Sequence, residues 1–221
     1  KRLRTYASLM ETPYHEDLLE WHATGQLALV GLDGDVTEVG EPAMIRGIDP
    51  APTGRHVRVE RMTRPFSYVV PVRNVGGVDE VWDLDGSVHV ELESEPVDTG
   101  IRDDDEGDDD SERRQVSWSP DGTALTFLQM DPAPEEDEGD AAADAAEEED
   151  EEGEGRRMDH LMVWPAPFDE GSATPLYSSR ARMQSYAFSE DGEMVVITSR
   201  RGQQTREYAV FPAESDSTYT L

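Results

Sequence analysis

Two segments of the chain, 70 residues apart, share one pattern of strand, glycine turn and strand. The first is VSWSPDGTALTFL at 116–128 and the second is YAFSEDGEMVVIT at 186–198. The glycine of each turn supplies the positive φ that a tight hairpin needs, and the preceding aspartate tolerates a left-handed backbone. A weaker third copy covers 48–59, with Thr53 in place of the aspartate. The pattern predicts repeated β-hairpins rather than helices, because the apolar residues alternate or run on without a 3.6-residue period.

A second motif interleaves with the first. An apolar strand leads into an Asp-Gly turn at 27–34 and again at 80–86, and looser copies occur further along. Equivalent positions in the four copies lie 52, 82 and 47 residues apart; they are Val30, Trp82, Trp164 and Phe211. Excision of two acidic stretches, 103–112 and 131–157, reduces the middle spacing to 45. The underlying period is therefore about 45 residues with four short strands in each repeat.

A period of about 40–50 residues with four strands is typical of β-propeller blades. The sequence predicts an all-β partial β-propeller of four-stranded antiparallel blades, about three and a half in number. We expect an irregular lead-in at 1–25 and blades over 26–221. A half-blade is expected near 26–40, and the other strands are expected near 45–49, 55–60, 79–83, 88–93, 115–118, 123–130, 160–164, 174–177, 184–188, 194–199, 206–211 and 217–221. Because the chain starts at Lys1 and closes too few blades, we interpret it as part of a longer protein.

The formal charge of −31 comes largely from acidic runs at 103–112 and 135–154, which lie in the two stretches that we interpret as disordered insertions within the propeller. The alternative is that they bind cations or a basic partner. The remainder is still acidic, with 29 acidic against 19 basic residues, so we expect no nucleic-acid partner. No apolar run is long enough for a membrane helix, and we expect no membrane segment in this chain. The absence of cysteine excludes disulfides and cysteine-based zinc sites.

The chain lacks the sequence signatures of catalysis. No Gly-x-Ser-x-Gly nucleophile elbow, phosphate-binding loop or dinucleotide fingerprint occurs, and we expect no catalytic residue and no cofactor. His56 and His89 fall in predicted strands, which favours a surface or packing role. The turn at Asp83, Asp85 and Gly86 resembles the start of a calcium loop but lacks its later ligands, so a hairpin turn is the favoured interpretation and no metal is expected.

The non-repetitive segments carry a more specific signal. These are YASLMETPYHEDLLE at 6–20 and RPFSYVVP at 64–71, together with IDP at 48–50 and VWDLDG at 81–86. Over most of residues 5–130 they resemble the N-terminal region of the glutamyl endopeptidase group of the prolyl oligopeptidase family of serine peptidases. Beyond residue 158 only the general propeller repeat supports this resemblance.

The resemblance implies a two-domain peptidase whose propeller precedes a C-terminal α/β-hydrolase domain carrying the catalytic triad. The implied partners are that domain, in the same protein, and peptide substrates. In this family the propeller restricts access to the active site, so the chain is expected to be inactive by itself. The alternative is a non-enzymatic propeller that binds a protein, since one fold serves many functions.

Strand alternation places the turns at Gly34, Gly54 and Gly86 on one face of the propeller. The two acidic insertions and the segment 64–71 are expected to emerge from the other. Within 64–71, Arg64, Phe66 and Tyr68 combine a fixed charge with aromatic surface. We interpret them as candidate contacts to the substrate or to the hydrolase domain, with Arg64 able to grip a carboxylate through two hydrogen bonds. The alternative is that Phe66 and Tyr68 cap the core of their blade.

Overall fold

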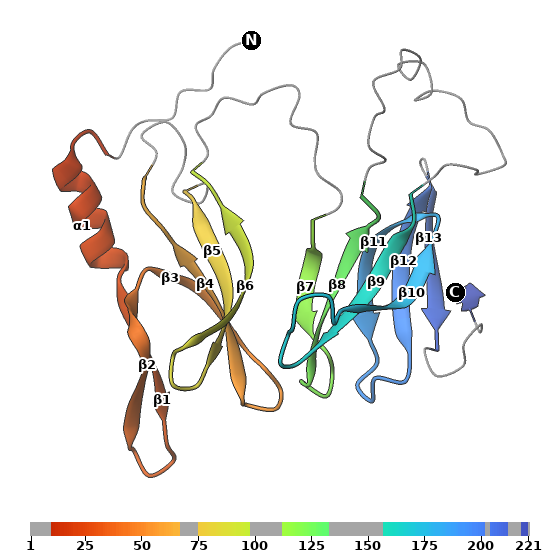
Figure 1. The fold of residues 1–221 in the computed structure, drawn as a ribbon, viewed down its shortest axis with the longest axis horizontal. Coiled ribbons are helices and arrows are strands. Elements are labelled where there is room, and N and C mark those ends of the chain that lie inside the picture. The colour runs from red at the N-terminus through yellow and green to blue at the C-terminus, as the bar shows by residue number, and fades with distance from the viewer. Residues whose placement is uncertain are drawn as a thin grey trace. The chain divides into compact units, whose positions relative to one another are not determined.

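The computed structural model describes residues 10–66, 75–97, 112–132, 157–201, 204–211 and 218–220, and most of them form β-sheet (Figure 1). Three sheets have four antiparallel strands and a fourth has two, and strand order in each sheet follows the sequence. The described residues therefore form a nearly all-β partial propeller, with three four-stranded blades and a two-stranded half-blade, as predicted, and one short helix. It divides into two compact units, Lys1–Gly107 and Asp108–Leu221.

The first unit contains one helix, the half-blade and one complete blade. Their bounds are α1 (Pro13–Ala23), β1 (Gly25–Val30), β2 (Val36–Ala43), β3 (Ile45–Pro50), β4 (His56–Met62), β5 (Gly77–Asp83) and β6 (Val88–Glu95). The half-blade packs on one face of the β3–β6 sheet, where Val39 of β2 is buried with Val57, Val59 and Trp82. Burial of these side chains joins the half-blade to the complete blade.

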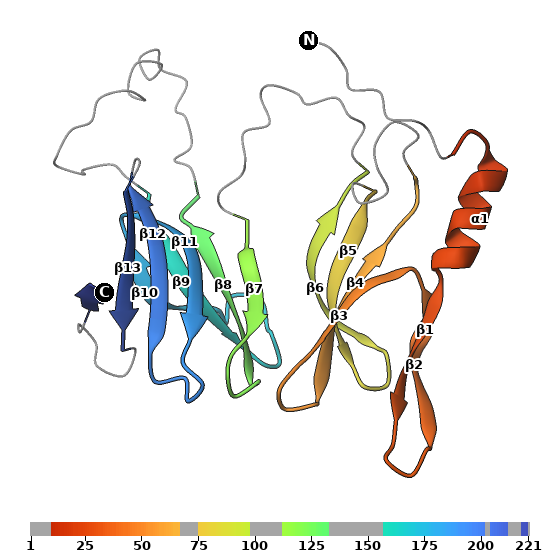
Figure 2. The same ribbon diagram turned by 180° about the vertical axis from the view of Figure 1, so that it is seen from behind.

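The second unit contains two complete blades. Their strands are β7 (Arg114–Trp118), β8 (Ala124–Met130), β9 (Asp159–Pro165), β10 (Thr174–Ser179), β11 (Arg182–Phe188), β12 (Val195–Arg201), β13 (Gln204–Val210) and β14 (Thr218–Thr220). Leu128 and Leu161 of one sheet share a buried cluster with Met183 and Ile197 of the other. The two blades therefore stack face to face through apolar side chains, and Figure 2 shows them side by side.

The turn glycines behave as the repeat predicts. Gly34, Gly54, Gly86, Gly122 and Gly192 all have positive φ. In the turns at 119–124 and 189–194 the same bonds recur: the serine hydroxyl donates to the aspartate at 2.6 Å, and a backbone N–H donates to that serine at 3.0 Å. Each Ser-x-Asp-Gly turn thus satisfies its own polar groups, which explains why this short motif defines a hairpin in the sequence.

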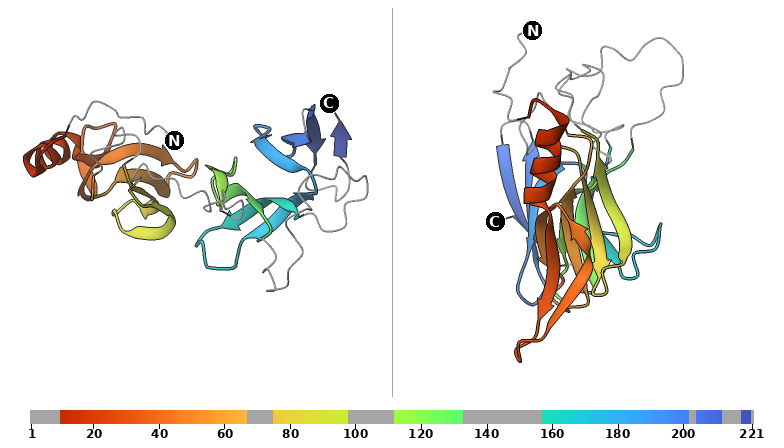
Figure 3. Two further views of the ribbon diagram at one scale, coloured as in Figure 1. Left: turned by 90° about the horizontal axis from the view of Figure 1, so that it is seen from above. Right: turned by 90° about the vertical axis from the view of Figure 1, so that its left-hand side faces the viewer.

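The predicted irregular lead-in at 1–25 is wrong in one respect, because it contains α1. Thr12 precedes the helix in an extended conformation, Pro13 occupies its first turn and Glu16 adds an acidic group there, all of which favour a helix start. None of the helix residues is fully buried, so the helix lacks the apolar stripe that would reveal it in the sequence. In Figure 3 the helix leads directly into β1.

Strand direction in two of the sheets fits the predicted alternation of strand ends. In the β3–β6 sheet, the end of β4, the start of β5 and the end of β6 lie opposite the turns at Gly54 and Gly86. In the β7–β10 sheet, the end of β8 and the start of β9 lie at the end where β7 begins. Most of the predicted insertions 103–112 and 131–157 fall outside the described residues. At the edge of the second insertion, the Asp131 N–H donates to the Met158 carbonyl at 2.9 Å and so extends the strand pair.

Candidate functional site

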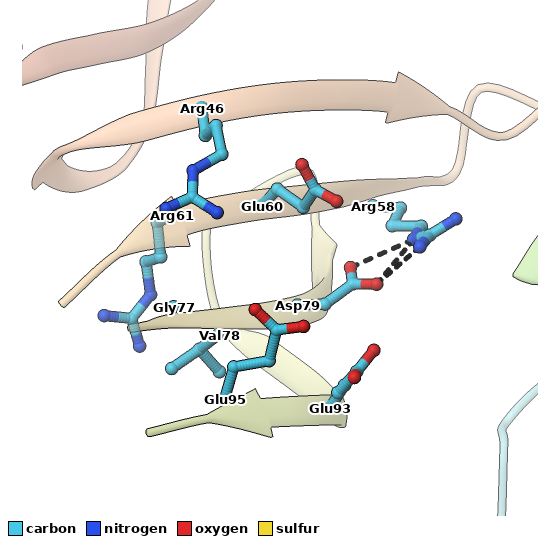
Figure 4. A pocket seen from close by; sticks show the side chains of 9 residues that line it. All are labelled: Arg46, Arg58, Glu60, Arg61, Gly77, Val78, Asp79, Glu93 and Glu95. Carbon is cyan, nitrogen blue, oxygen red and sulfur yellow. Dashed lines mark hydrogen bonds and ion pairs between the residues drawn. The ribbon is translucent and has the colours of Figure 1, made fainter. Parts of the chain in front are cut away.

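A charged pocket of about 80 Å³ lies on the β3–β6 sheet (Figure 4). Nine residues line it: Arg46, Arg58, Glu60, Arg61, Gly77, Val78, Asp79, Glu93 and Glu95. Three are cationic and four are anionic, so the lining is close to neutral and dense in hydrogen-bonding groups. None of the nine is a serine, histidine or cysteine, and the lining offers no nucleophile.

Arg58 of β4 and Asp79 of β5 form the central ion pair of the pocket. The Arg58 Nε lies 3.0 and 2.9 Å from the two Asp79 oxygens, and its Nη2 lies 2.6 Å from Oδ2 (Figure 4). Burial opposes the charge of Arg58, but hydrogen bonds and attraction from Asp79 outweigh this effect and hold the arginine pKa above its usual value. Arg58 is therefore held in its charged form and is not suited to act as a general base.

A second ion pair, Arg61 with Glu80, joins the same two strands, β4 and β5. Glu80 is 3% exposed and accepts hydrogen bonds from Arg61 Nε at 2.9 Å, Arg61 Nη2 at 2.7 Å and the Trp82 indole N–H at 2.8 Å. The bonds from Arg61 hold the pKa of Glu80 below its ordinary value of 4.5, against the opposing effect of burial, and Trp82 adds to this. The buried carboxylate is therefore satisfied by charged and neutral donors together.

Replacement of Glu80 by glutamine tests this network through its pH dependence. At neutral pH Glu80→Gln is expected to lower the free energy of unfolding by about 1–2 kcal/mol, because a neutral amide replaces a charged acceptor. A depressed folded pKa gives stability that is complete above the ordinary value of 4.5 and is lost as pH falls through the folded pKa. Urea unfolding at a series of pH values should show the two proteins converge on acidification. A difference that stays constant down to pH of about 3 would contradict this account.

The structure places Arg64 against helix α1. Its Nε donates to Glu20 at 2.7 Å, its Nη1 to Glu16 at 3.0 Å and its Nη2 to Asp17 at 2.8 Å. These bonds hold the arginine pKa above its usual value, with Glu20 the largest contributor. Helix α1 of this chain therefore supplies carboxylates that Arg64 binds. Contact with a substrate or a hydrolase domain stays a prediction.

Phe66 is buried, and its position fits the alternative of core packing. It is 4% exposed and belongs to a cluster with Met44 and Val75, against which Leu19 and Ala23 of α1 pack. The Arg64 guanidinium carbon lies 5.2 Å from the centre of the Phe66 ring, so the charge and the aromatic ring contact each other. Tyr68 lies outside the described residues.

Arg64 is expected to hold α1 on the blade. In Arg64→Ala the three helix carboxylates lose their shared cation and repel one another, so amide-exchange protection over 13–23 should fall while β3–β6 keeps its own. Arg64→Lys is the matched control: a compact ammonium cannot span three carboxylates, and protection should be intermediate. Unchanged protection of α1 in Arg64→Ala would show that apolar packing alone positions the helix.

Three potential metal ligands meet at the turn end of the same sheet. His56, Asp83 and His89 come from β4, β5 and β6, and one ligand atom of each lies within 4.8 Å of the other two. This group is not evident in the sequence. Its residues are separated by 27 and 6 positions, and only strand register brings them together. The expected hairpin turn at Asp83–Gly86 is confirmed, with the Gly86 N–H donating to the Asp83 carbonyl at 2.9 Å.

The pocket thus offers charged binding groups, and the pKa values of Arg58, Arg61 and the neighbouring Glu80 move away from neutrality. General acid–base catalysis at neutral pH needs the opposite shift. No helix in the described part of the chain has the length and apolarity to cross a membrane.

Comparison with known proteins gives two curated plant relatives, both named probable chloroplastic glutamyl endopeptidase. The protein from Oryza sativa is 32% identical over 133 residues, which cover 57% of this chain and 13% of the relative. The protein from Arabidopsis thaliana is 38% identical over 85 residues, which cover 38% of this chain and 9% of the relative. The chain therefore corresponds to a small part of each relative. No family model matches the sequence.

Solved structures with a similar arrangement of strands include two β-proteins of different names. TolB from Acinetobacter baumannii aligns with 89% of this chain and 37% of its own, at 13% identity and a TM-score of 0.43. The acylaminoacyl peptidase from Pyrococcus horikoshii aligns with 89% of this chain and 28% of its own, at 12% identity and a TM-score of 0.43. The link to proteins named as peptidases therefore rests on the two plant relatives, over a small part of their length.

Proposed function

We propose that this chain is the non-catalytic propeller portion of a serine peptidase of the prolyl oligopeptidase type. Its role is to restrict which substrates reach an α/β-hydrolase domain of the same protein. The observation that carries the proposal is the sequence identity with the two plant relatives, 32% over 133 residues and 38% over 85, at a level where chance similarity is a poor explanation.

The chemistry of the described residues supports a selecting role. A propeller blade presents packed β-strands and short turns, which form a rigid wall rather than a reactive surface. The charged pocket on β3–β6 holds its ion pairs at fixed positions and has no nucleophile. Such a wall discriminates between substrates by size and charge, while the bond-breaking groups come from the hydrolase domain.

A serine-directed probe tests the proposal. The complete reading frame that contains these residues and the 221-residue chain are expressed separately, and both are treated with a fluorophosphonate. We expect the complete protein to be labelled on one serine and to hydrolyse a glutamate-containing peptide, while the 221-residue chain does neither. Failure of the complete protein to react, or hydrolysis by the short chain that the probe abolishes, would contradict the proposal.

A further inference from the structure

His56, Asp83 and His89 form a compact cluster at the turn end of the β3–β6 sheet. His56 and Asp83 are directly opposed across β4 and β5, and His56 Nε2 lies 3.3 Å from Asp83 Oδ1. His89 approaches from β6, with its Nδ1 3.3 Å from Asp83 Oδ2. The two imidazole rings are 5.5 Å apart between centroids. Two imidazoles and a carboxylate thus converge from three adjacent strands.

We propose that this cluster binds a divalent transition-metal ion of the zinc class. Zinc takes imidazole nitrogen and carboxylate oxygen at about 2.0–2.2 Å in a tetrahedral arrangement, which places neighbouring ligand atoms about 3.3–3.5 Å apart. Each of the two nitrogen–oxygen distances has this spacing, one to each oxygen of the Asp83 carboxylate. One nitrogen of each imidazole lies within 4.8 Å of the other, so the side chains must adjust for both to reach one ion.

The donor set selects the class of ion. Calcium and magnesium prefer oxygen ligands alone, whereas zinc, nickel and copper accept imidazole readily. The three side chains are 15%, 38% and 28% exposed for His56, Asp83 and His89. A hydrated ion can therefore reach the cluster from solvent, and water can fill the fourth position that three protein ligands leave.

The turn between β5 and β6 holds two of the three ligands in place. The Asp83 N–H donates to the Ser87 carbonyl at 2.9 Å, and the Ser87 hydroxyl donates to Asp85 at 2.7 Å. His56 is fixed independently by its place at the start of β4. Ligands mounted on paired strands and a closed turn lose little freedom when an ion binds. A bound ion would link the ends of three strands and so stabilise the blade.

Calorimetric titration of the chelator-treated 221-residue chain with zinc chloride tests the proposal. We expect one ion for each chain with micromolar or tighter affinity that survives a large excess of magnesium or calcium. At about 100 times the dissociation constant, zinc should raise the melting temperature of the first unit by about 10–20 °C. Proton NMR should show shifts of His56 and His89 without shifts of the other histidines.

Four variants separate this site from adventitious binding by the acidic runs. His56→Ala and His89→Ala should each weaken the titrated site by at least about 100-fold, because two ligands remain. His160→Ala is the matched control: His160 also contacts an aspartate, Asp131, at 3.0 Å, but without a second histidine, and its loss should change nothing. Equal zinc binding by wild type and a His56→Ala, His89→Ala double variant would overturn the proposal. Absence of binding would do so too and would leave an ordinary hydrogen-bonded cluster.

Discussion

Gly86→Ala is expected to detach the half-blade from its neighbour and to lower the free energy of unfolding of the first unit by about 3 kcal/mol or more. A Cβ built at Gly86 would lie 1.9 Å from the Gly40 nitrogen and 2.0 Å from its Cα. Both partners are backbone atoms, so relief requires the β1–β2 hairpin to move. Gly86 also has a φ of +84°, which strains any other residue. Amide exchange over 25–43 should show the loss directly.

Gly34→Ala is the matched control for this change. Gly34 occupies the equivalent turn of the half-blade with a φ of +93°, but a Cβ there would have no atom within 4 Å. Gly34→Ala should therefore lower the free energy of unfolding by about 1–2 kcal/mol, through backbone strain alone. Equal losses in the two variants, or an unchanged exchange pattern over 25–43 in Gly86→Ala, would mean that the close approach between the half-blade and the β5–β6 turn is not a feature of the folded protein.

Asp159→Ala is expected to lower the free energy of unfolding of the second unit by about 3–5 kcal/mol. Asp159 is 1% exposed and holds two blades together: it accepts from Arg114 Nη2 at 2.5 Å and from the Met183 N–H at 2.7 Å. Alanine leaves the guanidinium and the amide without this acceptor in a site that water reaches poorly. Equilibrium unfolding in urea measures the loss, and Asp159→Asn, which keeps one acceptor, should lie between alanine and wild type.

Asp131→Ala provides the comparison for Asp159→Ala. Asp131 also contacts a side chain of the same blade, His160 at 3.0 Å, but the Asp131 side chain is 49% exposed. Exposed ion pairs contribute little to stability, so Asp131→Ala should lower the free energy of unfolding by about 1 kcal/mol or less. If Asp159→Ala were no more destabilising than Asp131→Ala, the blades would be held by the Leu128, Leu161 and Met183 cluster alone, and the ion pair would be incidental to the contact.

The sequence predicted the strands well because each repeat is self-contained. The hairpins at 116–128 and 186–198 carry their own turn chemistry, so local residues decide the structure. The observed strands β7, β8, β11 and β12 fall at the expected positions within two residues. Helix α1 escaped detection because it lacks a repeat motif of its own and its partner Arg64 lies 44 residues after Glu20. A contact of that range leaves no periodic trace in the sequence.

The candidate sites could be predicted less well for a related reason. Arg58 with Asp79, and His56 with Asp83 and His89, become neighbours only through strand register, and register needs the three-dimensional sheet. The sequence did identify Arg64 and Phe66 as unusual. In the first unit Arg64 forms three ion pairs, and Phe66 belongs to a buried cluster. Their residue types indicated that they make specific contacts, whereas the identity of the contacting residues could not be deduced from the sequence.

The central claim, that this chain screens substrates for a peptidase, is tested most directly by comparing two substrates of the complete protein. One is a short peptide containing glutamate, and the other is the same segment within a stably folded protein. If the propeller restricts access, kcat/KM for the free peptide should exceed that for the folded protein by at least about 100-fold, and unfolding the carrier should remove most of the difference. Comparable kcat/KM values for the free peptide and the folded carrier would contradict the claim.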